Sequence, residues 1–203
     1  MAIKLTELQK SALLEAGNIG AGHAAIALSQ LMGRKIMIAI PSIETFELST
    51  LASGIDGKNA KLVHVSLSVL GTTKGIMTFM LENTRALALC DIVMGQKKGK
   101  TKTLGDLEQS ALKEIGSILA ASYLNAISEM TGLSLVISTP DYDLGPIDLL
   151  EKVLARKELD LKKVKDVICI KTEFIEATTK IDGYLIFIPA QDAIDKVMGR
   201  LGV

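Results

Sequence analysis

Apolar positions in the first hundred residues change from helical spacing to alternation and then return to helical spacing. Residues 5–32 carry a stripe with intervals of three, four and seven, formed by Leu14, Ala21, Ala25, Leu28 and Met32. These intervals predict one long helix. Thr6 or Ser11 is placed to cap an early turn, and Gly33 is placed to end the helix.

Three apolar runs then predict strands, at 36–44, 61–70 and 76–81. The last two are joined by the turn sequence GTTKG, which favours a hairpin. A shorter helix with the sequence RALALCDIVM follows, with Asn83 or Thr84 as its cap and Gly95 at its end. The first unit of the chain therefore has the order helix, three strands, helix.

The rest of the chain repeats this unit at a constant offset of 99 positions. SALLEAGNIGA at 11–21 aligns with SALKEIGSILA at 110–120, and 13 of the 35 positions in 7–41 are identical in 106–140. Average residue usage would give about two identities in such a pairing. The similarity predicts a duplicated domain with two equivalent sites.

The second unit follows the same order, with one additional element. Its pattern predicts a helix at 105–131, strands at 133–139, 164–174 and 183–189, a final helix at 190–199 and an inserted helix at 145–159. We therefore expect an α+β fold, with a pseudo-twofold duplicated unit of helix, three strands and helix. Its six-stranded, mostly antiparallel sheet has two long helices on one face. A single domain would contain the repeats 1–98 and 99–203, joined by the basic, solvated linker QKKGKTK at 96–102.

Composition removes several classes of function. The formal net charge is zero, so no nucleic-acid partner is expected. We expect no secretory segment and no membrane span, because MAIKLTELQK lacks an apolar stretch and no apolar run approaches the length of a span. Cys90 and Cys169 lack CxxC spacing, which favours buried free thiols and the cytoplasm. His23 and His64 form no ligand cluster, so no metal site and no cofactor of the protein's own are expected.

Polar residues on the first helix form a possible site. Ser11, Glu15, Asn18 and Gly22 are separated by four, three and four positions, which places them on one helix face. Pro41 follows Asn18 by 23 positions. In the second unit Ser110, Glu114 and Pro140 occupy the matching positions, and Ser117 replaces the asparagine.

Two simpler interpretations of this helix remain open. A Glu-x-x-Asn pair is often only a solvated helix face. Gly17, Gly20 and Gly22 are unfavourable inside a helix by about 1 kcal/mol each relative to Ala, and they allow either packing against another backbone or close approach of a docked partner. A phosphate-binding loop at GNIGAG is disfavoured, because the preceding KLTELQKSALLEA is helical in pattern and no Lys-Ser/Thr pair follows.

The pattern SALLEAGN…P, from Ser11 to Pro41, resembles the signature of the CheC, CheX and FliY chemotaxis phosphatases. The resemblance extends over almost the whole chain and is greatest to CheC, because the two copies differ and GPIDLLEKVLARKEL resembles the CheC insert. It implies removal of the phosphoryl group from aspartyl-phosphorylated CheY. Asn18 would position the hydrolytic water, Glu15 would pair with a basic group on CheY, and the divalent metal would belong to CheY.

The resemblance also implies an asymmetric pair of sites and a second partner. Glu114 and Ser117 would form a weakened or docking-only site, because a serine hydroxyl reaches less far than an asparagine amide. The alternative function is a binding module that regulates the receptor deamidase CheD, with minor catalysis. Its candidate surface is Ile147, Leu150 and Leu154, unless their helix caps the core. A monomer is expected, and a purely structural duplicated domain is the remaining alternative.

Overall fold

The computed structural model describes residues 5–51, 55, 60–157, 166–177, 179–190 and 193–203. The first helix, α1, runs over Glu7–Met32. The Thr6 hydroxyl accepts the Gln9 backbone N–H at 3.1 Å, and the Gln9 side chain accepts the Thr6 N–H at 3.0 Å. Gly33 ends the helix in the left-handed conformation, with a φ of 61°. Both predicted ends of this helix are therefore confirmed.

The strands in the described part of the chain form one sheet, and all of their pairings are antiparallel. Its members are β1 (Met37–Glu47), β2 (Leu62–Gly71), β3 (Gly75–Glu82), β4 (Leu135–Ile137), β5 (Asp141–Gly145), β6 (Asp166–Glu176) and β7 (Thr179–Pro189). Their order is β1-β6-β7-β3-β2-β4, with β5 also paired to β2. The predicted α+β class and antiparallel pairing are confirmed.

The two repeats exchange strands within this sheet. Strand β1 pairs with β6 of the second repeat, whereas β4 and β5 of the second repeat pair with β2 of the first. The pairing of β3 with β7 joins the two hairpins at the centre. The sheet is therefore continuous across the repeats. The boundary between residues 98 and 99 stays a prediction.

Within the described residues the sheet has seven strands, where the sequence predicted six. In the first repeat, β1 stays continuous past Pro41, with a register shift between Ala39 and Ser42. In the second repeat the matching strand ends at Ile137 and resumes at Asp141, beyond Pro140. Proline cannot donate a ladder hydrogen bond, and the two repeats accommodate it in different ways. The sequence analysis missed β5.

The remaining helices are α3 (Asn83–Val93), α4 (Asp106–Thr131), α5 (Leu149–Arg156) and α6 (Ala193–Leu201), and a 3₁₀ turn spans Leu48–Thr50. The predicted cap of α3 is wrong: the N-cap is Glu82, which makes no side-chain capping bond. Gly132 ends α4 in the left-handed conformation, as predicted. No helix within the described part of the chain is long and apolar enough to cross a membrane.

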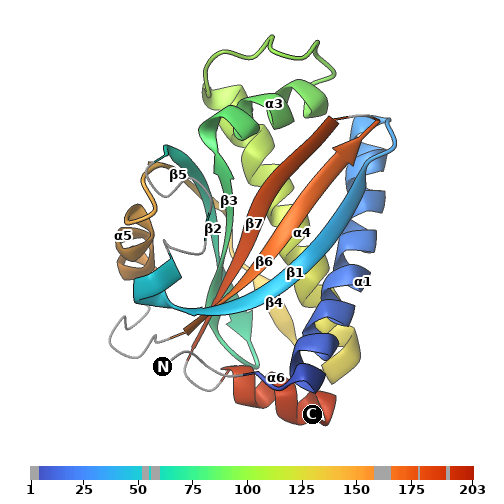
Figure 1. Ribbon diagram of the computed structural model, residues 1–203, viewed down its shortest axis with the longest axis vertical. Helices are drawn as coiled ribbons and strands as arrows, with labels where there is room; N and C mark the ends of the chain where they lie inside the picture. Colours follow the sequence, from blue (N-terminus) through green and yellow to red (C-terminus); the bar gives the residue numbers. More distant parts are fainter. Residues whose placement is uncertain (1–4, 52–54, 56–59, 158–165, 178, 191–192) are drawn as a thin grey trace.

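Helices α1 and α4 lie side by side and antiparallel on one face of the sheet, and α3 and α6 lie at opposite ends of the molecule (Figure 1). The main core fills the space between these helices and the sheet. It is centred on fully buried residues such as Leu28, Phe79, Leu112 and Ile115. The predicted arrangement of two long helices on one face is therefore confirmed.

A second, smaller core lies on the opposite face, under α5. Ile147, Leu150 and Leu154 belong to it, with relative exposures of 6%, 2% and 0%. The prediction that these side chains form a surface for CheD is therefore wrong. They are the apolar stripe of a core-capping helix, the alternative that their spacing also allowed.

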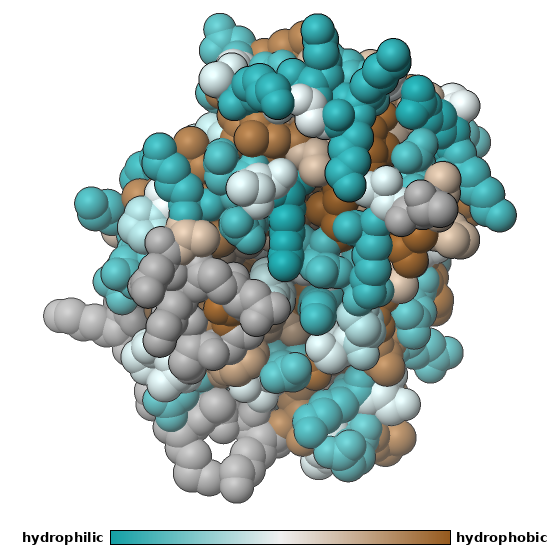
Figure 2. All heavy atoms as spheres, turned by 45° about the horizontal axis from the view of Figure 1, so that its top comes forward, coloured by the Kyte–Doolittle hydropathy of each residue, from teal (hydrophilic) through white to brown (hydrophobic). Residues whose placement is uncertain are grey.

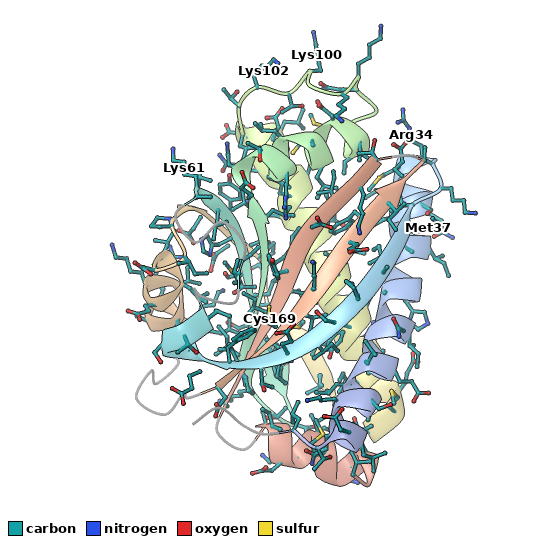
Figure 3. The ribbon with its side chains drawn as sticks, in the orientation of Figure 1. Arg34, Met37, Lys61, Lys100, Lys102 and Cys169 are labelled. Atoms are coloured by element: carbon teal, nitrogen blue, oxygen red, sulfur yellow. The ribbon has the colours of Figure 1, made fainter. Side chains whose placement is uncertain are left out.

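The basic linker at 96–102 is held in place by one buried carboxylate. Asp91, on α3, accepts the backbone N–H groups of Gly99 at 2.6 Å and Thr101 at 2.7 Å. Lys100 and Lys102 project from this segment into solvent (Figure 3). The surface at this end of the molecule is mostly hydrophilic (Figure 2). The predicted solvated loop is therefore confirmed, and its backbone is anchored.

Candidate functional site

The polar stripe of α1 lies on the outer surface of the molecule. Ser11, Glu15, Asn18 and Gly22 are all exposed, whereas Leu13 and Ala16 on the opposite side of the helix are buried in the core. Glu15 and Asn18 are three positions apart, so their side chains are neighbours on the helix surface. The predicted shared face is confirmed.

Neither side chain of this pair is committed to an intramolecular contact. Among the described residues, the Glu15 carboxylate and the Asn18 amide take part in no hydrogen bond or ion pair. By contrast, Lys10 and Glu7 on the same helix are paired at 2.9 Å. An uncommitted carboxylate can accept from a cation, and an uncommitted amide can both donate and accept. Both groups are therefore free to bind another molecule.

Pro41 lies in the irregular part of β1, beside the same turn of α1. A Cβ atom placed on Gly17 would lie 3.0 Å from Cδ1 of Ile40 and 3.6 Å from Cδ1 of Ile43. These contacts bring the strand residues on either side of Pro41 against the helix, directly behind the turn that carries Asn18. The signature proline is exposed and contributes to the backbone that supports this turn.

The glycines of α1 have different surroundings. A Cβ atom on Gly20 would lie 2.8 Å from Cα of Tyr123 and 3.0 Å from the carbonyl oxygen of Ser122, so Gly20 lies where α1 crosses α4. Gly17 likewise faces side chains of the core. A Cβ atom on Gly22 would have no contact within 4 Å. Helix packing therefore explains Gly17 and Gly20, and only Gly22 offers room to a partner.

The second copy of the site differs at its critical position. Ser110 and Glu114 are exposed, and Ser117 is half-buried. The Ser117 hydroxyl donates to the backbone carbonyl of Lys113 at 2.9 Å, so it is bound to its own helix. Leu119, which replaces Gly20, is buried in the core. The Leu119 side chain therefore packs inside the protein and does not face a partner.

No other group in the described chain competes as a reaction centre. No cluster of three or more His, Cys, Asp or Glu side chains is placed to hold a metal ion among these residues. Cys90 and Cys169 are free and buried, and burial raises the pKa of each thiol to about 12. Both thiols therefore stay protonated at neutral pH and are poor nucleophiles.

The sequence analysis missed a set of exposed apolar side chains beside the polar stripe. Leu8, Ile19 and Ile26 on α1 are all exposed. A signal for them existed, because Leu107 and Ile118 occupy two of the matching positions in the second repeat.

Comparison with known proteins agrees with this geometry. The sequence pattern of the CheC-like family matches residues 8–44 and 107–142, which contain the two copies of the motif. The CheY-P phosphatase CheC of Bacillus subtilis (strain 168) is 29% identical over 203 residues, covering 98% of this chain and 96% of that protein. The flagellar motor switch phosphatase FliY of the same organism is 27% identical over 149 residues, covering 73% of this chain and 38% of FliY.

Solved structures share the fold. The crystal structure of Thermotoga maritima FliY superposes with a TM-score of 0.80 at 24% identity, covering 98% of both chains. The middle domain of FliM from H. pylori superposes with a TM-score of 0.67 at 11% identity, covering 97% of this chain and 99% of that domain. This chain therefore carries two segments that match the CheC-like family pattern, is similar over nearly its whole length to a CheY-P phosphatase, and shares the fold of FliY.

Proposed function

We propose that this protein is a phosphatase that removes the phosphoryl group from the aspartyl phosphate of CheY. The observation that carries the proposal is the exposed, uncommitted pair of Glu15 and Asn18 on α1. Both residues lie within the first segment matched by the family pattern. The nearly full-length relative is named a CheY-P phosphatase, which supports the same activity.

The chemistry suits an amide better than a strong base. In the reaction, a water oxygen attacks phosphorus in line with the bond to the aspartyl oxygen, and that bond breaks. The products are a carboxylate on CheY and inorganic phosphate. The two protons of the attacking water go to the phosphate, which can release a proton to solvent. The transition state for phosphoryl transfer is loose, so positioning of the water contributes more than its deprotonation. The Asn18 amide oxygen accepts a hydrogen bond from this water and orients it.

Glu15 has a separate role in this proposal. Its carboxylate lies one turn before Asn18 and pairs with a cationic side chain of CheY, which fixes the position of the amide in the partner's active site. The partner supplies the aspartyl phosphate, and the divalent metal is expected to be bound by CheY. This protein contributes one aligned hydrogen bond and one ion pair across the interface.

The test is decay of phosphorylated CheY with wild-type protein and with Asn18→Ala. We expect the variant to lose about 100-fold in kcat, a typical effect of removing one positioned catalytic group. Its free energy of unfolding should change by less than about 0.5 kcal/mol, because the side chain is exposed. Gln30→Ala removes another exposed amide from α1 and should retain full activity. A folded Asn18→Ala protein with wild-type turnover would contradict the proposal.

Glu15→Lys tests docking separately from water positioning. Reversal of the charge should weaken binding to CheY held in its activated form by a phosphate mimic, and isothermal titration calorimetry measures the change. Lys10→Glu reverses a charge on the same helix, at a residue already paired with Glu7, and serves as the control. Equal affinity of wild type and Glu15→Lys would remove Glu15 from the interface.

A further inference from the structure

The exposed face of α1 carries a second pattern, beside the catalytic pair. Its members are spaced by four, three, four, three and four positions: Leu8, Ala12, Glu15, Ile19, Gly22 and Ile26. We call these six residues the α1 seam. Leu8, Ile19 and Ile26 have relative exposures of 62%, 36% and 60%. Alternating steps of three and four are the spacing by which one helix packs along another.

The same surface pattern occurs in the second repeat. The matching residues on α4 are Leu107, Ala111, Glu114, Ile118, Ala121 and Asn125, of which the first four are identical to their counterparts in the α1 seam. Leu107 is 66% exposed, so neither it nor Leu8 serves a core. Single exposed leucines need no explanation. Here, however, an exposed leucine is followed by a glutamate seven positions later in both copies. This repetition indicates that the surfaces of the two helices serve the same purpose.

We propose that the α1 seam receives an amphipathic helix of the partner protein on which Asn18 acts. This inference rests on the proposed function, which makes that partner CheY. The occupant is a helix because the seam has helix-packing spacing. Gly22 has open space above it, and Ala12 is small, so another backbone can approach closely.

Charge defines the occupant further. Glu15 lies in the middle of the seam, between the apolar positions Leu8 and Ile19. A helix that covers this row must present apolar residues at three- and four-residue spacing and one Lys or Arg opposite Glu15. Burial of an unpaired carboxylate would oppose binding. The seam is also continuous with the proposed active site, because Asn18 lies between Glu15 and Gly22 on the adjacent ridge of the helix.

The corresponding row on α4 is less suited to this role. Ile118 is half-buried and packs against the main core, and Asn125 replaces Ile26. The apolar contact area is therefore smaller in the second copy. The partner helix should prefer α1, where the amide is also uncommitted.

The first experiment compares two double variants by the kinetics of CheY-P dephosphorylation. Leu8→Gln/Ile26→Gln should raise KM at least tenfold and leave kcat within about twofold, because neither side chain is proposed to touch the reacting atoms. The control, Leu31→Gln/Leu70→Gln, changes two leucines that are 58% and 43% exposed and lie off the seam. It should leave both constants unchanged. Circular dichroism checks that both variants fold.

The second experiment keeps the two proposals separable. Binding to CheY held in its activated form by a phosphate mimic is measured by calorimetry, without any turnover. If the wild type binds and the seam variant binds at least tenfold more weakly, the seam proposal stands even if no phosphatase activity is found. Equal binding by the wild type and the seam variant, or no binding by the wild type, overturns it.

The third experiment identifies the element that occupies the seam. Ile26→Cys introduces an exposed thiol, while Cys90 and Cys169 are buried, so a maleimide photocrosslinker labels position 26 selectively. Crosslinks should map to one face of one CheY helix, at intervals of three and four residues. Crosslinks to CheY loops or strands, or to a second copy of this chain, overturn the proposal.

Discussion

At the scale of single residues, Asn18 and Ser117 hold matching positions but have different freedom. The Asn18 amide is exposed and uncommitted among the described residues. The Ser117 hydroxyl donates to Lys113 within its own helix. A serine that bonds back to the preceding turn of its helix offers only a lone pair to water. Under the proposed function, both the absence of an amide and the hydrogen bond of the Ser117 hydroxyl to its own helix would weaken the second site.

Ser117→Asn should therefore restore an amide beside Glu114. We expect it to raise phosphatase activity and to recover part of the activity lost in Asn18→Ala when the two substitutions are combined. Single-turnover decay of CheY-P measures both effects. A double variant without recovery that still binds CheY would make the second copy a docking surface. A double variant with neither recovery nor binding would leave the repeat a role in the fold alone.

His64 is a buried titratable residue that the proposed reaction does not use. It is fully buried on β2, and neither ring nitrogen has a hydrogen-bond partner within the described structure. Burial lowers the pKa of His64, although the nearby Gly145 and Pro146 carbonyls and the Asp143 carboxylate act in the opposite direction. Asp143 is itself paired with Arg156 of α5, so this anion is already partly neutralised.

The lowered pKa of His64 predicts acid sensitivity. As the pH falls below 6.5, the histidine binds a proton in the unfolded chain before it does so in the folded protein. The free energy of unfolding therefore falls as the pH falls towards the folded-state pKa. Urea unfolding at pH 7.5 and 5.5 should show a smaller loss of stability for His64→Gln than for the wild type. The exposed His23 provides the control: His23→Gln should retain the wild-type loss.

At the scale of elements, the crossing of α1 and α4 sets the position of the site. Gly20 allows the two helix backbones to approach, since a side chain there would overlap Tyr123 and Ser122. That close approach buries one side of α1 in the core and leaves the stripe with Glu15 and Asn18 on the outside. The helix crossing thus determines which residues are available for binding.

Two glycine substitutions distinguish packing from helix propensity. Gly20→Ala places Cβ 2.8 Å from Tyr123 Cα and should destabilise the protein by about 1 to 3 kcal/mol, as overpacking does. Gly22→Ala meets no atom within 4 Å and should stabilise it by about 0.5 to 1 kcal/mol through helix propensity. Chemical denaturation measures both values. The same sign for both substitutions would contradict this assignment of the crossing.

The elements could be predicted from sequence where local chemistry determines them. Thr6 and Gly33 fix the ends of α1 through capping and a left-handed residue, and both are visible in a short window of sequence. The split between β4 and β5 was missed because the residues around Pro41 and Pro140 have similar sequence patterns. Whether a strand continues past the proline depends on the strand it pairs with, which the local sequence does not reveal. The role of Ile147 stayed open between a core-capping helix and a partner surface, because apolar spacing does not say whether a core or a partner covers the stripe. The exposure of Leu8 was missed for the same reason.

At the scale of the whole molecule, the exchanged strands join the two repeats independently of the linker. Each repeat supplies an outer strand to the hairpin of the other: Met37 pairs with Ile175 in one direction, and Leu62 pairs with Gly145 in the other. Helices α1 and α4 cross between the repeats as well. The chain connection at 96–102 adds no strand to this arrangement.

Cleavage of the linker should therefore leave the protein assembled. A site for a sequence-specific protease inserted between Lys97 and Lys98 places the cut in the exposed loop. After cleavage, we expect both fragments to elute together from a size-exclusion column at the volume of the intact chain, and to separate only in denaturant. Separation under native conditions would mean that the shared sheet and helix crossing do not hold the halves together.

The strand exchange also bears on how such a chain could have arisen. In a single repeat, the outer edge of the hairpin would be unpaired, and the first strand would have no hairpin to pair with. A second copy of the same repeat would supply both pairings, so the stable form would be a dimer of identical copies. Such a pair carries the same two sites by symmetry, and any substitution alters both at once. Fusion of the two genes removes that constraint. One copy can then keep asparagine while the other accepts serine, and a symmetric ancestor becomes a protein with two unequal faces.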